Sequence, residues 1–596
     1  MKKTLLKGKS KALAWTREQD TIYMVALAVV IGVLSGYVAL LIRFMIEWVS
    51  LLWTGERTWE TVIGSLPWYI YLIAPTLSGL AVGWITVWLL PNGELRGVSG
   101  VLADMVERKA RIHPRQLGTE MAGATLAIGS GISLGREGPT IAMGALLASE
   151  IGQWLGLTEQ QLRILVGCGV AAGIAASFNT PIAGVFFALE VILADYAIAT
   201  FSPIVIASVL ATVVSRSELG NFPAFTVPEY HLISTWEIPS YIAIGAICGL
   251  VAMVFIKAMP PTRKWLETLM PDRRFRLALV GLMIGLIGLA IPQVMSIGYG
   301  IVEDMMLERI HPELLGSVLP LAEFLAIVLV GKLVATILSA AGGFPGGLFG
   351  PVLFLGATIG AMCGGVFHAI SPEYSESYGA YALVACGALT AAALQAPLTV
   401  MLIVFEMTAN YQIMLPLMAA CSVATLVTRS FGHGSLFTEV LEERGIESHW
   451  GLEQSWMRSV PVSRIPWRSI PRISEMARLQ ELKQVYTASG KGCVQVVDDA
   501  GLMVGIVTFS DLQQWLIDPT LDQIVVAGEV ANRDVLVISE SDSLLDAIHI
   551  LDREEFEQMP VVAADNPCKV LGILSRNAIF STYHKMIVKH GEGEHA

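Results

Sequence analysis

The stretch that decides the fold is residues 129–140, which read GSGISLGREGPT. Its glycines permit positive φ angles and a close approach of the backbone to an ion. Pro139 suits the opening of a helix, because it lacks an N–H group that would be unpaired there anyway. The run from Thr140 to Ile151 is expected to be that helix. Its N-terminal amides and positive dipole end would face the turn, so the pattern predicts an anion site made of backbone amides.

A second turn of similar design, GGLFGP at residues 346–351, lies far along the chain. Gly347 follows Gly135 by 212 positions. Two further segments, residues 181–190 and 397–406, each run from a proline to a glutamate and lie 216 positions apart. Two matches at nearly one spacing favour a duplicated unit over two unrelated membrane segments broken by Gly and Pro.

Composition divides the chain into an apolar body and a soluble tail. Residues 451–596 hold 33 charged residues, whereas the first 450 positions hold only 57. The runs at 21–42 and 69–90 are long enough to cross a bilayer, which takes about 20 residues. Later apolar runs are short and interrupted, and broken helices in lipid need surrounding protein or a water-lined cavity. The body is therefore predicted to be a polytopic membrane transporter built from repeats.

The charge pattern sets location and partners. Residues 1–20 are basic, and positively charged flanks stay on the cytoplasmic side. We therefore expect a multi-pass protein of the plasma (inner) membrane with both termini in the cytoplasm. The net charge of −12 argues against nucleic-acid binding, which needs a basic surface. Neither a metal-ligand spacing nor a nucleophile–base pair is recognisable, so the sequence predicts a protein that is not an enzyme and needs no cofactor.

Glu137 is the ionisable residue within the first turn. A carboxylate there competes with an anion for the same amides, so it would fill the site when ionised and leave when protonated, as a gate coupled to pH. The alternative is that Arg136 and Glu137 only pair with each other in a cytoplasmic loop, and the residues alone favour neither interpretation. The second turn carries no charge, and neutral amides attract an anion without holding it tightly, as conduction requires.

Over roughly residues 20–445 the chain resembles the CLC family of chloride channels and anion/proton exchangers. Four blocks in the family's order carry the resemblance, namely GREGP at 135–139, FNTPIAGVFF at 178–187, GLFGP at 347–351 and EMTANY at 406–411. It implies an all-α membrane domain at 21–445, an inverted repeat of tilted, broken helices with halves at about 21–220 and 235–445. It also implies a homodimer with one anion pore in each subunit.

The resemblance assigns roles within the two turns. It implies that Glu137 is the external gating glutamate and that the amides of Leu348 and Phe349 line the central anion site. Arg136 and Gly138 of the first turn are further candidate anion-binding residues.

Two positions depart from the family's anion-binding pattern. The family's first signature, GSGxP, is matched by VSGVL at residues 98–102, where Ser99 is the candidate hydroxyl, although an alignment one step away would place a glycine there. The family's tyrosine hydroxyl falls on Phe437 in GHGSLF at 432–437, and a phenyl ring cannot donate a hydrogen bond. Chloride, fluoride and other small anions therefore all remain candidates.

A third departure concerns protons. Exchangers of the family usually carry two adjacent carboxylates, whereas Glu190 is followed here by Val191, which cannot relay a proton. We therefore expect channel-like transport, with an anion/proton antiporter, including a fluoride/proton one, as the alternative, and we interpret Glu190 as a structural carboxylate. A CBS-regulated cation transporter is a more distant alternative. It needs clustered oxygen ligands, whereas Glu137, Glu190 and Glu406 are isolated.

The tail alternates strand-like and helical runs, as α/β units do. Gly505 and Gly572 lie 67 positions apart in matching runs. The tail resembles a soluble α/β pair of CBS domains at 461–588, with repeats at about 461–520 and 527–588. A linker is expected at 446–460 and a disordered end at 589–596.

The resemblance to CBS domains implies an adenine nucleotide as the ligand of the tail. Thr508 and Asp511 match the family's ribose-binding pair. In the second repeat Ser575 is followed by Ala578, so that copy lacks the acid. The alternative is a dimerisation module without a ligand.

Overall fold

The computed structural model describes residues 2–89, 97–113, 119–194, 198–220, 230, 234, 237–314, 317–370, 378–431, 434–442, 460–490, 492–516, 519–553, 556–564 and 566–582. The side chains of residues 2–21 are not described, so the basic N-terminal segment lies outside the described side chains. The predicted linker, apart from Val460, and the predicted end at 589–596 lie outside the described residues. Contacts divide the chain into two units, Met1–Ser448 and His449–Ala596.

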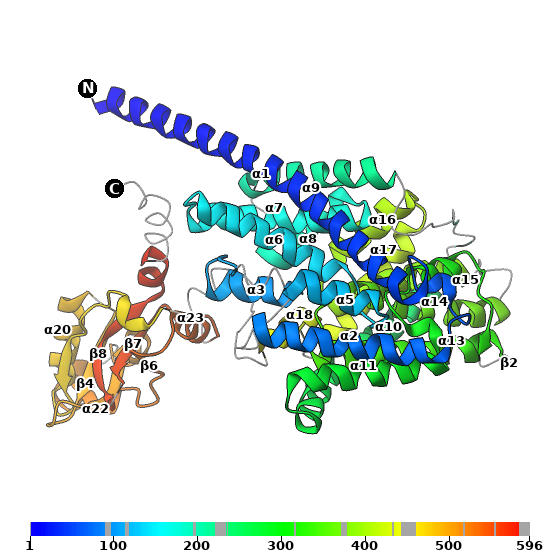
Figure 1. Ribbon diagram of the computed structural model, residues 1–596. Coiled ribbons are helices and arrows are strands. Elements are labelled where there is room, and N and C mark those ends of the chain that lie inside the picture. The colour runs from blue at the N-terminus through cyan, green and yellow to red at the C-terminus, as the bar shows by residue number, and fades with distance from the viewer. Residues whose placement is uncertain are drawn as a thin grey trace. The chain divides into compact units, whose positions relative to one another are not determined.

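The first unit is a layered bundle of helices, in which α1 lies alongside α9 (Figure 1). Seven helical segments among the described residues are long and apolar enough to span a membrane. The helices are α1 Lys2–Thr54, α2 Trp68–Leu89, α3 Gly97–Glu107, α5 Ala124–Gly129, α6 Glu137–Trp154, α7 Glu159–Phe178, α8 Pro181–Phe187, α9 Ile198–Leu219, α10 Ile238–Leu269, α11 Arg273–Ala290, α12 Tyr299–Met306, α13 Leu321–Gly342, α14 Phe349–Ile370, α15 Tyr378–Leu394, α16 Pro397–Thr408, α17 Met414–Ser430 and α18 Leu436–Glu442.

The predicted spans at 21–42 and 69–90 correspond to α1 and α2. Helix α6 begins at Glu137, three residues before the predicted start. Pro139 therefore lies in the first turn, where its missing N–H breaks no helical hydrogen bond. As a result Glu137 belongs to the first turn of α6 rather than to the loop before it.

The two halves of the membrane unit repeat the same irregular turns. Gly131 and Gly343 both have positive φ angles, 93° and 98°. Asn179 and Gln395, each just before the start of a short helix, have φ angles of 63° and 56°. An arginine fixes each of these two turns: Nε of Arg216 donates to Oδ1 of Asn179 at 2.6 Å, and Nε of Arg429 donates to Oε1 of Gln395 at 2.7 Å. The duplication read from the sequence thus extends to backbone conformation and to side-chain contacts.

The second unit contains two three-stranded sheets of identical topology. In each sheet the first strand pairs in parallel with the second, and the second pairs antiparallel with the third. The helix after β5 begins at Phe509. The elements are β3 Arg472–Ser474, α20 Leu479–Ser489, β4 Cys493–Val497, β5 Met503–Thr508, α21 Phe509–Gln513, α22 Ala527–Val530, β6 Ile538–Ser539, α23 Leu544–Arg553, β7 Gln558–Ala563 and β8 Asn566–Ser575.

Candidate anion site

The two Gly-Pro turns lie against each other at the centre of the membrane unit. The amide of Gly135 donates to the carbonyl of Gly347 at 2.7 Å, and the amide of Gly347 donates back at 2.6 Å. This contact leaves no room for side chains, since a Cβ on Gly347 would lie 2.5 Å from the amide nitrogen of Gly138. The pairing brings the N-termini of α6 and α14 together, although they are far apart in the sequence.

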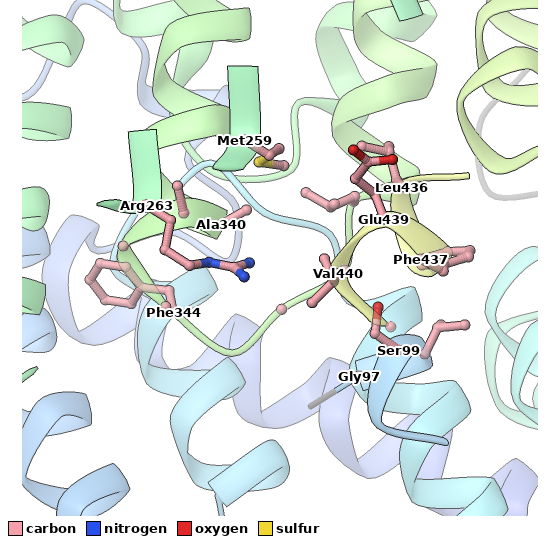
Figure 2. A pocket seen from close by; sticks show the side chains of 18 of the residues that line it. Gly97, Ser99, Met259, Arg263, Ala340, Phe344, Leu436, Phe437, Glu439 and Val440 are labelled. Carbon is pink, nitrogen blue, oxygen red and sulfur yellow. The ribbon is translucent and has the colours of Figure 1, made fainter. Parts of the chain in front are cut away.

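A cavity of about 280 Å³ opens beside the paired turns. Five of the predicted anion-binding residues line it, namely Ser99, Gly138, Leu348, Phe349 and Phe437. Figure 2 shows Ser99 and Phe437 on facing elements, α3 and α18. Among the described residues, neither the Ser99 hydroxyl nor the amides of Leu348 and Phe349 have a hydrogen-bond partner. Unpaired N–H groups at a helix start attract anions.

Phe437 contributes only apolar surface to this cavity. Its side chain is almost fully buried. Its amide donates to Oγ of Ser435 at 3.2 Å, so the amide is already satisfied. The wall that α18 presents to the cavity therefore lacks a hydroxyl donor at this position, as the sequence indicated.

Glu137 lies on the paired turns but outside the residues that line the cavity. Its side chain is fully buried. Oε1 accepts a hydrogen bond from the Tyr299 hydroxyl and lies 3.9 Å from Nε of Arg136. Oε2 has no hydrogen-bond partner in the part of the chain that the structure describes. It lies near Gly135 and Gly350, because a Cβ added to them would lie 2.4 and 3.5 Å from it, respectively. This burial does not fit a simple ion pair in a solvated loop.

Arg136 is placed differently from the other candidates. It is not among the residues that line the cavity. Its guanidinium lies 5.6 Å from the centre of the Tyr299 ring. Arg136 therefore contacts the surroundings of Glu137 rather than the cavity, and a direct contact with an anion there has no geometric support.

Two buried residues of this region were not among the site residues predicted from the sequence. Tyr299 opens α12, and its hydroxyl reaches Glu137. Lys332, inside the apolar helix α13, is fully buried. A lone charged residue within a membrane-spanning run is a signal for function, so Lys332 was recognisable from its position. Nothing in the sequence pairs Tyr299 with Glu137, which lies 162 positions earlier.

Glu190 and Glu406 each cap the start of a short helix in the opposite half of the membrane unit. Glu190 accepts the amides of Leu398 and Thr399, at 3.2 and 2.8 Å, at the start of α16. Glu406 accepts the amides of Ile182 and Ala183, at 2.9 and 2.8 Å, at the start of α8. A carboxylate at a helix start satisfies unpaired amides and the positive dipole end.

Val191 follows Glu190 in the π-helical turn Ala188–Leu193 and is half-buried. It packs against the apolar core of the membrane unit. The valine side chain offers no group that could accept or donate a proton at this position.

The lining of the cavity includes charged side chains. Arg263 at the end of α10, and Arg273 and Arg276 at the start of α11, line it together with Glu267 and Glu439. Figure 2 shows the Arg263 guanidinium pointing into the cavity. Three guanidinium groups and two carboxylates line the cavity, so these side chains together carry one net positive charge.

In the second unit the predicted nucleotide residues form a capping box at the start of α21. Oδ2 of Asp511 accepts the amide and the hydroxyl of Thr508, at 2.8 and 2.7 Å. The other carboxylate oxygen of Asp511 has no partner among the described residues, so it is free to accept a ribose hydroxyl. In the second repeat the amide of Ala578 donates to Oγ of Ser575 at 3.2 Å, and no acid is present.

The fold and the site define a multi-pass membrane protein in which two helix N-termini meet beside a cavity. Residues 78–429 match the family described as Voltage gated chloride channel. This match covers more than half of the chain, so the chain belongs to that family, the CLC family, whose members transport anions. Residues 462–518 and 527–585 match CBS domains, which commonly bind adenine nucleotides. The predicted family and fold class are thereby confirmed.

Named relatives include both channels and exchangers. The chain is 32% identical over 381 residues to the Putative chloride channel protein ClcB-like of Ralstonia nicotianae, covering 63% of this chain and 86% of that protein. It is 28% identical over 426 residues to the H(+)/Cl(-) exchange transporter ClcA of Vibrio parahaemolyticus, covering 70% and 88%.

Solved structures agree with this assignment. A slow cyanobacterial Cl-/H+ antiporter matches with a TM-score of 0.62 and 25% identity, over 71% of this chain and 98% of its own. A eukaryotic CLC transporter matches with a TM-score of 0.60 over 94% of this chain and 98% of its own. At 18% identity, the second likeness concerns the fold alone.

Proposed function

We propose that this chain moves chloride or a similar small anion across the plasma (inner) membrane, through a pore in each subunit of a homodimer with cytoplasmic termini. The cavity beside the paired turns supports this proposal, because a serine hydroxyl and unpaired helix-start amides converge on it. Such neutral donors bind an anion weakly enough to release it. The relatives named as chloride channels and exchangers support the same substrate.

The burial of Glu137 is the observation that carries the gating part of the proposal. The Glu137 carboxylate is fully buried at the start of α6, and in this proposal it competes, when ionised, with an anion for the positive helix start. Protonation removes its charge and weakens its hold on the positive helix end and on Arg136. The neutral side chain then leaves, and an anion takes its place. Acid on the side of Glu137 therefore opens the passage.

The mode of transport that we propose is channel-like. Val191 packs in the apolar core and carries no proton, which supports movement of anions without protons. An anion/proton antiporter, including one for fluoride, is the second candidate. It is favoured by the H(+)/Cl(-) exchange transporter among the relatives and by the structural neighbour that is a Cl-/H+ antiporter.

Flux from liposomes that contain the purified full chain tests both parts. A chloride gradient is imposed with and without a clamped pH gradient, and chloride and proton movements are recorded together. Chloride flux that drives no protons supports the channel, coupled proton movement supports the antiporter, and absence of any halide flux overturns anion transport. Glu137→Ala should make flux independent of pH, whereas Glu323→Gln, an exposed glutamate in the first turn of α13, should leave it unchanged.

We also propose that an adenine nucleotide regulates transport from the first CBS repeat. The free carboxylate oxygen of Asp511 beside Thr508 supports this site. Asp511→Ala should abolish nucleotide binding to the full chain, measured by calorimetry. Asp546→Ala is the matched control. Asp546 caps α23 through Ser543 in the same manner, but it is not part of the predicted ribose-binding pair Thr508 and Asp511. Absence of nucleotide binding to the wild-type chain would favour a dimerisation module without a ligand, and equal binding by wild type and both variants would exclude Asp511 from the site.

A further inference from the structure

The loop between α1 and α2 reaches the surroundings of Glu137 from two sides. Nε1 of Trp59 donates to the carbonyl of Gly129 at 2.9 Å, at the beginning of the first Gly-rich turn. Trp59 is almost fully buried. The next residue, Glu60, accepts the amide of Gly298 at 2.9 Å, directly before Tyr299. One short loop therefore contacts both chain segments that carry the pair Tyr299 and Glu137.

Lys332 contacts the same segment through its backbone carbonyls. Its ammonium group donates to the carbonyls of Val294, Ser296 and Ile297, at 3.0, 2.8 and 3.3 Å. It also lies 4.8 Å from the centre of the Phe354 ring. A buried ammonium is costly unless its donors are satisfied, and here all three find oxygen partners. The segment Val294–Tyr299 is therefore fixed by a cation on its carbonyls and by a carboxylate on an amide.

Both cations and carboxylates lie around Tyr299 and Glu137. Burial raises the pKa of the Glu60 carboxyl, and the amide of Gly298 and the cations Lys332 and Arg136 oppose that effect. The charged or titratable groups that face Tyr299, Glu137 and their neighbours are Arg43 on α1, Glu60 before α2, Arg136 at the start of α6, Lys332 on α13 and Cys386 on α15. Within the described part of the chain, the hydroxyl of Tyr299 is the one group that donates a hydrogen bond to the Glu137 carboxylate.

We propose that Tyr299 latches the ionised Glu137 in the closed position, and that Lys332 and Glu60 are positioning residues that act on the gate through Tyr299. This inference rests on the gating role proposed above for Glu137. A hydroxyl that donates to a carboxylate stabilises the charged form over the neutral form. The latch therefore determines how much acid is needed before Glu137 leaves.

The direction of the effect follows from the donor. Without the hydroxyl, the closed state with ionised Glu137 loses a charge-assisted hydrogen bond, so opening needs less acid. Tyr299→Phe should raise the pH of half-maximal flux by about one unit, a roughly tenfold change in proton concentration, as expected for one such bond. Tyr71→Phe is the matched control. Tyr71 lies on α2, accepts the amide of Gly64 at 3.2 Å and contacts the Trp59 ring, but it does not touch Glu137.

Double variants separate positioning from mere structural support. Lys332→Met and Glu60→Gln should each raise the pH of half-maximal flux in the wild-type background. Neither should change it further in the Tyr299→Phe background, because the latch is already absent. A purely structural role would give equal shifts in both backgrounds, which would overturn the positioning role. Glu60→Gln, which removes the negative charge beside the Gly298 amide and Lys332 but keeps the size of the side chain, provides the measurement if Lys332→Met does not fold.

Failure of the latch and failure of the gate give different results. If Glu137→Ala abolishes the pH dependence but Tyr299→Phe behaves like Tyr71→Phe, the gate stands and the latch is overturned. If Glu137→Ala keeps the wild-type pH dependence, the gating proposal fails and the latch falls with it. A shift in Tyr299→Phe that is absent in Tyr71→Phe, together with loss of pH dependence in Glu137→Ala, supports both.

Discussion

Glu190→Gln is expected to destabilise the membrane unit without changing the coupling of anions to protons. The carboxylate of Glu190 accepts two backbone amides at the start of α16 and also the hydroxyl of Thr399 at 2.6 Å. Glutamine keeps one oxygen but turns an NH₂ group toward these donors, so at least one bond is lost and one contact becomes repulsive. Glu406, at the equivalent place in the other half, accepts two amides and no hydroxyl within the described ranges.

The size of the effect follows from these contacts. Hydrogen bonds to a charged group contribute about 1.5–3 kcal/mol each, and the lower end applies because the site is only partly buried. A loss of about 2–3 kcal/mol corresponds to a fall of roughly 2–4 °C in the unfolding midpoint of a unit of this size. Thermal unfolding in detergent, followed by tryptophan fluorescence, measures it. Glu406→Gln should lower the midpoint by a smaller amount.

A different pattern would refute this reasoning. If the wild-type chain moved protons in the liposome assay, and Glu190→Gln lost that movement while keeping the wild-type midpoint, Glu190 would be a proton carrier rather than a cap. A larger loss of stability in Glu406→Gln than in Glu190→Gln would show that the number of hydrogen bonds does not determine the effect.

Three further outcomes are expected. Gly347→Ala should abolish flux and lower the unfolding midpoint, because its Cβ would lie 2.5 Å from the amide nitrogen of Gly138; unchanged flux would contradict the pairing of the turns. Arg273→Gln, which removes a positive charge from the cavity lining, should raise the half-saturating chloride concentration about two- to fivefold, whereas Arg274→Gln, whose guanidinium lies 4.2 Å from the centre of the Trp84 ring, should not. Burial raises the pKa of Cys493 to about 11 from an ordinary value of 9.0. At pH 8 its thiolate is therefore roughly a hundredfold scarcer than that of an ordinary cysteine, and its alkylation should be slower by the same factor. Mass spectrometry should detect rapid modification of Cys493 only after the tail is unfolded in urea.

Much of the fold was predictable because it depends on local patterns. The turns at Gly135 and Gly347 carry their own conformational signals, and the repeat spacing revealed the duplication. The start of α6 was misplaced by three residues, since Pro139 is compatible with any position in a first helical turn. The anion-binding candidates share one cavity apart from Arg136, whose side chain turns toward Tyr299.

The sequence by itself determined the family, the duplicated design and the neutral amide donors, because glycine, proline and apolar runs act on their immediate neighbours. Only the tertiary structure decided which distant residues meet. The hydrogen bond between Tyr299 and Glu137, the contacts of Lys332 and the reciprocal caps of Glu190 and Glu406 join positions 35 to 224 residues apart. Such contacts depend on helix packing, in which each side chain is compatible with many partners until the bundle closes.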